Sequence, residues 1–262
     1  MLLQDYLSHY DITEHQLLSF CEAAPTDSAV MLGGSLSEGF GTLESDLDLY
    51  VIVAAPLDSS HTHHFVTSIG SALRREVRFA SGRRVDIKYI PSASLQALGL
   101  ALETALSTTQ LGCRLLPSET LEMCHRLLAG YPLRNEEALR AATRLAGITH
   151  ERLSQYLVRL RSHDSLRAER YAYRKSGTLS EAIAARLALE AAADAILAAH
   201  GQTNTRFEKW RIRKTRALMP EHLWARELLA CLIAPCSYGV PAVQVDSLGL
   251  DNPPAERVEI GA

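Results

Sequence analysis

Residues 33–51, GGSLSEGFGTLESDLDLYV, join a glycine-rich turn to an apolar run that holds two aspartates. The apolar residues 29–32 before it predict a buried strand that ends at the two glycines. Residues 46–55 predict a second buried strand, and we expect residues 35–40 to form a short helix between the two. The stretch lacks the Gly-Lys-Ser/Thr ending of a P-loop, so its glycines require another explanation.

The two aspartates, Asp46 and Asp48, are one residue apart in the second predicted strand. Side chains at positions i and i+2 of a strand point to the same face, so two carboxylates are expected side by side. Such close like charges favour a cation between them. Mg²⁺ prefers carboxylate oxygens and substrate phosphates, so the pair predicts a magnesium site.

A third carboxylate is available from Asp86, in a predicted hairpin that spans residues 77–90 and turns at Ser81 and Gly82. Alternation along its second arm places Asp86 on the polar face of the strand. Three carboxylates around one or two Mg²⁺ ions would form a two-metal site that activates an attacking oxygen and stabilises a leaving pyrophosphate. The glycine turn would then hold phosphates through backbone N–H groups.

These residues resemble the DNA polymerase β-type nucleotidyltransferase superfamily. The likeness consists of Gly34-Ser35, ten further residues, then Asp46-Leu47-Asp48-Leu49, with Asp86 on a later strand. The residues Ser45-Asp46-Leu47-Asp48-Leu49 also resemble the Ser-Asp-Ile-Asp-Leu sequence of bacterial aminoglycoside- and lincosamide-type adenylyltransferases. The resemblance is specific over residues 30–53, looser over 84–90 and only architectural beyond about residue 115.

The resemblance implies an enzyme that transfers a nucleoside monophosphate, expected to be AMP from ATP, to a hydroxyl group of a small-molecule acceptor such as an antibiotic. Pyrophosphate would be released, and Mg²⁺ would be required, in a two-metal site. By position, the implied catalytic residues and metal ligands are Asp46, Asp48 and Asp86, of which Asp86 could instead be a general base. The implied triphosphate-binding residues are Gly34, Ser35 and Ser45.

The chain departs from the family pattern where many relatives carry an arginine shortly after Gly-Ser. Here Glu38 occupies that region, and no basic residue occurs until Arg74. The most basic stretch, residues 204–214, is expected to supply the missing positive charge from a helix, through Lys209 and Arg206. Arg206, Lys209 and Arg213 recur at helical spacing, so one stripe of that helix would face the phosphates.

The predicted organisation is α+β: the sequence patterns indicate a small sheet-containing domain with flanking helices (residues 1–120), then an all-α domain (residues 121–262). The resemblance implies that the first is a mixed-sheet nucleotidyltransferase domain and that the second helps form the nucleotide and acceptor cleft. Sequence patterns in the first segment predict helices in residues 1–24 and 61–76. After Pro91, helices are expected near residues 92–106, 117–129, 135–162, 178–200, 205–218 and 220–233. Thr178 and Glu181 form a capping-box pattern, and Gly201 is expected to end that helix.

The composition and charge of the chain bear on its partners and its location, but they do not identify a substrate. The 262 residues carry a net charge of −3, which argues against nucleic acid as the main partner. The five scattered cysteines and the lack of a 20-residue apolar run favour a cytoplasmic protein with no membrane span. Two alternatives stay open: transfer to a protein or an RNA end, and a catalytically silent nucleotide-binding module. The acceptor, the preferred triphosphate and the oligomeric state are not predicted.

Overall fold

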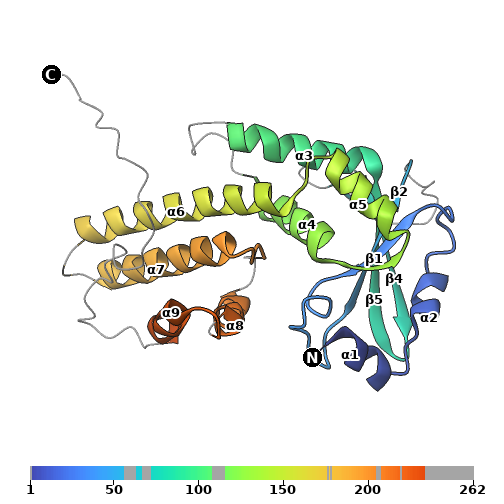
Figure 1. Cartoon of the computed structure of the whole chain (residues 1–262), viewed down its shortest axis with the longest axis horizontal. Helices are drawn as coiled ribbons and strands as arrows, with labels where there is room; N and C mark the ends of the chain where they lie inside the picture. Colours follow the sequence, from blue (N-terminus) through green and yellow to red (C-terminus); the bar gives the residue numbers. More distant parts are fainter. Residues whose placement is uncertain are drawn as a thin grey trace.

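The computed structural model describes residues 2–55, 63–66, 72–107, 116–175, 177, 179–204, 208–218 and 220–233. The strands are β1 (Ala29–Gly33), β2 (Leu47–Val53), β3 (His63–Val66), β4 (Ala72–Ala80), β5 (Arg83–Pro91) and β6 (Tyr131–Arg134). The helices are α1 (Leu3–His9), α2 (Glu14–Ser19), α3 (Ser92–Ser107), α4 (Ser118–Ala129), α5 (Glu136–Leu145), α6 (His150–Arg174), α7 (Leu179–Ala199), α8 (Glu208–Leu218) and α9 (Leu223–Ile233). The fold therefore belongs to the mixed α+β class (Figure 1).

One mixed sheet, in the order β3-β4-β5-β2-β1-β6, organises the first half of the chain. β2 and β5 are parallel, and the other neighbouring pairs are antiparallel. β1 and most of β2 are buried, which explains their nearly continuous apolar sequence. The register places Gly33 opposite Asp48, and Asp48 opposite Asp86, so the glycine turn and two aspartates lie at one end of the central strands.

Each face of the sheet packs against helices. On one face, the core contains Tyr6 and Leu17 of the N-terminal helices together with Leu49 and Ile87 of the sheet. On the other face, Tyr50 belongs to a second core that contains residues of α3, α4, α5 and α6. Two hydrophobic cores on a shared sheet fix the positions of the strand ends, because a one-residue slip would turn every apolar side chain to the wrong face.

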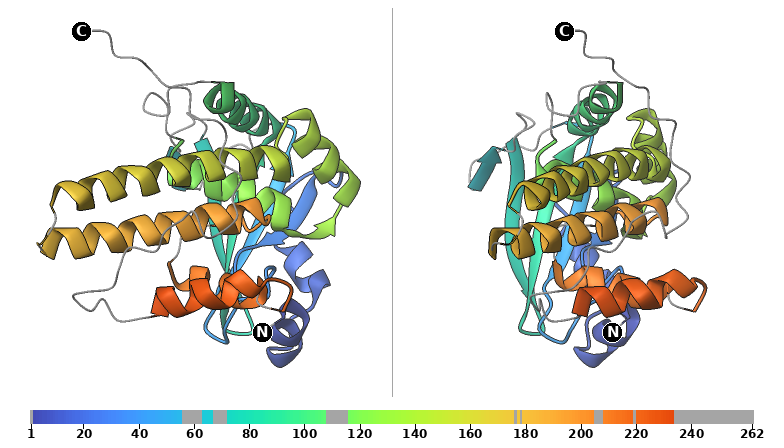
Figure 2. Two further views of the ribbon diagram at one scale, coloured as in Figure 1. Left: turned by 60° about the vertical axis from the view of Figure 1, so that its left-hand side comes forward. Right: turned by 90° about the vertical axis from the view of Figure 1, so that its left-hand side faces the viewer.

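The long helices α6 and α7 lie side by side and extend away from the sheet (Figure 1). α8 and α9 lie along the lower side of this pair, and the views in Figure 2 show the same arrangement from two other directions. Arg211 of α8 anchors the helix to α7 through hydrogen bonds of 2.7 and 3.1 Å to the Asp194 carboxylate. A contact of 3.3 Å between Arg211 and Glu190 adds to this ion-pair network.

Two predictions in the first half of the chain are wrong. Residues 35–39 form a turn followed by an irregular Phe40, because Gly34 and Gly39 take positive φ angles of 85° and 75° that end any helix. The predicted helix at 61–76 contains β3 and the start of β4, whose pairing with neighbouring strands overrides local helical periodicity. Residues 61, 62 and 67–71 of that prediction lie outside the described residues.

The second half also differs from its prediction. The expected helix at 135–162 is two helices, since Gly147 has a φ of 71° and the Thr149 side chain caps the start of α6. β6 is a strand in the segment expected to be entirely helical, and it pairs with β1 at the sheet edge. The hairpin turn at Ser81 and Gly82 is confirmed, with φ angles of 48° and 76°.

The end of α7 is also confirmed: the helix stops at Ala199, and Gly201 takes a φ of 79°. Thr178 of the predicted capping box lies outside the described residues. Of the helices in the described part of the chain, none has the length and apolar character needed to cross a membrane.

A close contact between α3 and the chain after α5 yields the first testable prediction. A Cβ at Gly99 would lie 1.5 Å from the backbone oxygen of Ala146, a distance that no side chain can occupy. Gly99→Ala should therefore lower the free energy of unfolding by about 3 kcal/mol, despite the better helix propensity of alanine. Urea unfolding measures this, and Gln96→Ala on the exposed face of α3 is the matched control. Equal urea midpoints for Gly99→Ala and Gln96→Ala would contradict the close approach of Gly99 to Ala146.

Candidate functional site

The glycine turn sits directly against one of the strand aspartates. Gly34 follows β1 with a φ of 85°, and a Cβ there would lie 2.8 Å from Oδ2 of Asp48. Glycine therefore satisfies two demands at once, a left-handed backbone and a close approach to a carboxylate. The Ser37 hydroxyl donates a hydrogen bond of 2.9 Å to the Gly34 carbonyl oxygen and holds the turn in place.

Three hydroxyl groups gather next to this turn. The Ser35 hydroxyl donates to Oγ of Ser45 over 3.3 Å, and Oγ1 of Thr42 lies 3.4 Å from the same atom. The backbone N–H of Thr42 also donates to Ser45 Oγ, at 2.9 Å. Ser45 thus ties the turn after β1 to the start of β2 and forms a small cluster of polar hydrogen-bonding groups.

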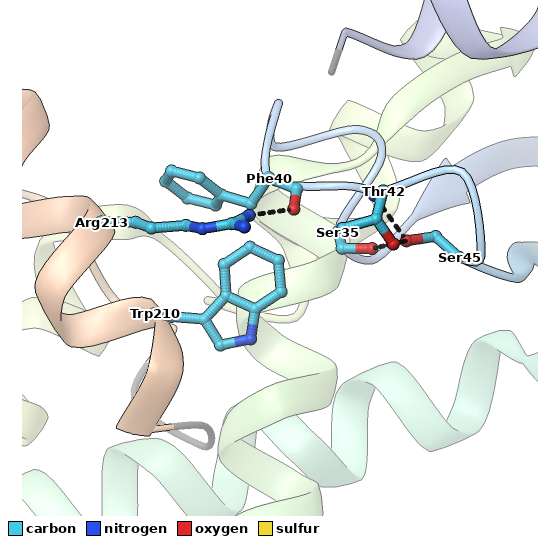
Figure 3. Close-up of a pocket in the computed structure, with 6 residues that line it drawn as sticks. All are labelled: Ser35, Phe40, Thr42, Ser45, Trp210 and Arg213. Carbon is cyan, nitrogen blue, oxygen red and sulfur yellow. Dashed lines mark hydrogen bonds between the residues drawn. The ribbon is translucent and has the colours of Figure 1, made fainter.

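A small pocket separates these hydroxyls from α8. Its lining residues are Ser35, Phe40, Thr42, Ser45, Trp210 and Arg213. Figure 3 shows Trp210 and Arg213 reaching from α8 toward the glycine-rich loop. The Arg213 guanidinium donates a 2.6 Å hydrogen bond to the Phe40 carbonyl oxygen, and the rings of Phe40 and Trp210 are 4.8 Å apart. The volume of about 90 Å³ suits a phosphate-sized group, because ligand pockets for whole nucleotides are several times larger.

Asp48 is held by two basic side chains. Lys88 Nζ donates to Oδ1 of Asp48 over 2.8 Å, and Arg126 of α4 lies 3.3 Å from Oδ2. Both cations also donate hydrogen bonds to the hydroxyl of the buried Tyr50. Burial raises the pKa of Tyr50, and the Asp48 charge raises it further, so this hydroxyl stays protonated.

The other two aspartates of the predicted site differ from each other. Asp86 is buried, and its two oxygens accept hydrogen bonds from Arg75 at 2.6 Å and from Arg84 at 3.0 Å. Asp46 is exposed and precedes β2 instead of belonging to it. The structure therefore brings Asp48 and Asp86 into register on adjacent strands, whereas Asp46, two residues before Asp48, lies outside the ladder.

The donor chemistry of these aspartates suits a hard cation, since all their ligand atoms are carboxylate oxygens. In the structure, however, both oxygens of Asp48 and both oxygens of Asp86 face basic side chains. No group of three or more His, Cys, Asp or Glu side chains placed to hold a metal occurs in the described part of the chain. Binding of a divalent cation to this pair would thus require the basic side chains to change partners.

Glu38, in the loop between β1 and β2, belongs to a buried polar network. Its Oε1 accepts a 3.0 Å hydrogen bond from the Asn204 side chain, and its Oε2 lies 3.1 Å from Nε2 of His125 in α4. His125 Nδ1 is 2.8 Å from the Thr203 hydroxyl, and Lys214 of α8 donates to the Asn204 carbonyl oxygen. The network connects the glycine-rich loop to α4, α8 and the segment after α7.

Burial and neighbouring charges shift the pKa values of Glu38 and Lys214 in this network. Burial alone would raise the pKa of Glu38, but its contacts with His125 and Asn204 and the charge of Lys214 lower it below the ordinary value. Burial lowers the pKa of Lys214 to about 8, although Glu38 and Asp194 act against this. Glu38 is therefore a structural anion of the loop.

The sequence-predicted basic residues are only partly described. Lys209 lies in α8, but its side chain and the whole of Arg206 are outside the described residues. Arg213, on the same predicted stripe, lines the pocket. The partners of the aspartates from β4 and α4, Arg75 and Arg126, were missed, since nothing local in the sequence links them to Asp86 or Asp48. Glu38, His125, Asn204 and Lys214 are likewise too far apart in sequence for any motif to connect them.

Comparison with known proteins adds no identification. Neither the scan against protein-family models nor the search of curated proteins gives a match for this chain. Interpretation of the site therefore depends on its own geometry.

The buried Lys214 leads to a pH-dependent prediction. Above about pH 8 the folded protein releases the Lys214 proton, whereas the unfolded chain keeps it up to about pH 10.5. The unfolded state then binds more protons, so stability rises with pH in this window. Compared with Lys214→Met, the wild-type free energy of unfolding should increase by about 2 kcal/mol between pH 8 and pH 10. Urea unfolding at several pH values measures it, and a difference that is constant with pH would contradict the assignment.

Proposed function

We propose that the protein is a nucleotidyltransferase that transfers a nucleoside monophosphate, AMP from ATP, to a hydroxyl group of a small-molecule acceptor. The observation that carries this proposal is the contact of the Gly34 turn with Asp48, which itself lies in register with Asp86. A phosphate held at the turn would lie next to both carboxylates. This arrangement matches the role that the resemblance to the polymerase β-type superfamily assigns to these residues.

In this proposal the sheet and the helices after it form the two sides of one cleft. Residues 1–120 supply the glycine turn and the carboxylates, and residues 121–262 supply α8. Contacts between the two parts support a shared site: Arg213 hydrogen-bonds to Phe40, and Asn204 to Glu38. β6 belongs to the second segment by sequence but to the sheet by pairing, which ties the two parts together.

One phosphate group of the donor triphosphate is proposed to bind in the pocket between the loop and α8. Backbone N–H groups of the turn and the hydroxyls of Ser35 and Ser45 would hydrogen-bond to phosphate oxygens. Arg213 supplies a guanidinium on the opposite wall, where it can form charge-assisted hydrogen bonds. Lys209 and Arg206 stay proposed partners of the triphosphate, because they come from the same stretch of chain.

The reaction is an in-line displacement at the α-phosphorus. The acceptor oxygen forms a bond to phosphorus, the bond from phosphorus to the bridging oxygen of pyrophosphate breaks, and Asp86 accepts the proton of the acceptor hydroxyl. Asp46 and Asp48 would hold Mg²⁺, which would supply charge neutralisation for the triphosphate and the leaving pyrophosphate. The contribution of the chain is positioning, because phosphoryl-group chemistry of this kind needs orientation and electrostatic stabilisation more than covalent help.

A cytoplasmic location belongs to the same proposal.

The test is transfer of label from α-³²P-ATP to a panel of hydroxylated compounds with Mg²⁺, with pyrophosphate release measured in parallel. Asp48→Asn and Asp86→Asn should each lower turnover at least 100-fold, since each removes a charge next to the reacting phosphate. Asp27→Asn, in the exposed segment before β1, is the matched control and should keep full activity. Activity within tenfold of wild type in either site variant, or ATP binding without any pyrophosphate release, would contradict the proposal.

A further inference from the structure

The sheet surface around Asp86 carries a distinctive set of side chains. Arg84 and Asp86 of β5 lie on one face, and the register pairs Asp86 with Val77 and Arg84 with Phe79 of β4. Directly opposite residues in a ladder share a face, so these four side chains and Arg75 form one patch. We call these five residues the β4–β5 patch.

The polar part of the β4–β5 patch is positively charged. Two guanidinium groups, those of Arg75 and Arg84, face the single carboxylate of Asp86 at 2.6 and 3.0 Å. Their side chains are 31% and 43% exposed, whereas the Asp86 side chain is only 9% exposed. A ligand that approaches from solvent therefore meets arginine first, and the carboxylate lies beneath.

The apolar part lies beside the arginines. Val77 is 43% exposed and Phe79 is 67% exposed, and both lie on the same face of β4 as Arg75. The exposed ring of Phe79 lies beside these partly exposed arginines and can contact the apolar part of a ligand. The β4–β5 patch thus offers contact to a molecule that carries both an apolar group and an anionic group.

The patch lies away from the proposed triphosphate site. In the sheet order, β5 and β4 are on the far side of β2 from β1, and the Gly34 turn follows β1. With strands about 4.8 Å apart, the patch is about 10–14 Å across the sheet from the turn. Asp86 is the member of the patch next to Asp48, so an acceptor bound on the other patch residues would present its hydroxyl to Asp86.

We propose that the acceptor is anionic: a hydroxyl compound with a carboxylate or phosphate group next to an apolar or aromatic part. This inference rests on the proposed function and names the substrate class of the same site. Arginine pairs bind such oxyanions in a bidentate manner, and Phe79 and Val77 contact the apolar part. A polycationic acceptor such as an aminoglycoside would meet like charges here, and like-charge contacts reject wrong partners.

Three matched probes test the charge preference: 4-hydroxyphenylacetate, its amide, and tyramine, which share a hydroxylated ring and differ in charge. Dissociation constants are measured by ligand-observed NMR with Mg²⁺ and a non-hydrolysable ATP analogue present. The carboxylate should bind at least tenfold more tightly than the amide, and tyramine should bind most weakly. Phenyl phosphate compared with phenylacetate then distinguishes which oxyanion is preferred.

Arg84→Gln should weaken binding of the carboxylate about tenfold and leave binding of the amide unchanged. Arg78→Gln is the matched control, because Arg78 is an exposed arginine of the neighbouring strand β4 that lies opposite Val85, on the other face of the sheet, and pairs with Glu76. Stronger binding of tyramine than of the carboxylate, no binding of the carboxylate, or equal effects of the two substitutions would overturn the inference.

Binding of the ATP analogue in the same samples separates this inference from the proposed function. If the analogue binds and Ser35→Ala weakens it, but the probes do not follow the predicted order of charge, only the anionic acceptor is refuted. If the analogue does not bind to the wild-type protein, the nucleotidyltransferase proposal fails, and the acceptor inference fails with it.

Discussion

The close approach of Gly34 to the carboxylate of Asp48 is the constraint around which the site is built. It requires that β1 and β2 be neighbours, that their register pair Gly33 with Asp48, and that residue 34 have neither a side chain nor a negative φ. Parallel pairing of β2 with β5 then places Asp86 next to Asp48. The two cores on either face of the sheet keep these strands in register, so the site depends on packing that lies well away from it.

The loop between β1 and β2 has no regular secondary structure, and buried polar contacts fix it instead. The Glu38 carboxylate contacts the side chains of Asn204 and His125, and Lys214 of α8 donates a hydrogen bond to the Asn204 carbonyl oxygen. An unpaired anion buried at this point would be strongly destabilising, so loop, α4 and α8 depend on one another. The same contacts set the distance between the hydroxyls of the turn and Arg213, the two walls of the phosphate-sized pocket.

The sequence predicted the central part of this arrangement well because it is encoded locally. Alternation in β5, the apolar runs of β1 and β2, and the turn at Gly82 all depend on residues near one another in the chain. β3, β6 and the first part of β4 were missed, because local periodicity does not show their strand character, whereas residues 77–80 of β4 were predicted as the first arm of the hairpin. The basic partners of the aspartates were missed for the same reason: Arg126 meets Asp48 only after α4 folds onto the sheet. Whether Lys209 and Arg206 reach the pocket stays a prediction.

The central claim is that the turn at Gly34 and the pocket wall from α8 grip the triphosphate next to Asp48 and Asp86. The most direct measurement is a crystal structure with Mg²⁺ and a non-hydrolysable ATP analogue. The account predicts phosphate density within hydrogen-bond distance of Ser35 and Arg213, with Lys88 or Arg126 moved away from Asp48. Nucleotide bound elsewhere on the protein, with the ion pairs of Asp48 and Asp86 unchanged, would contradict it.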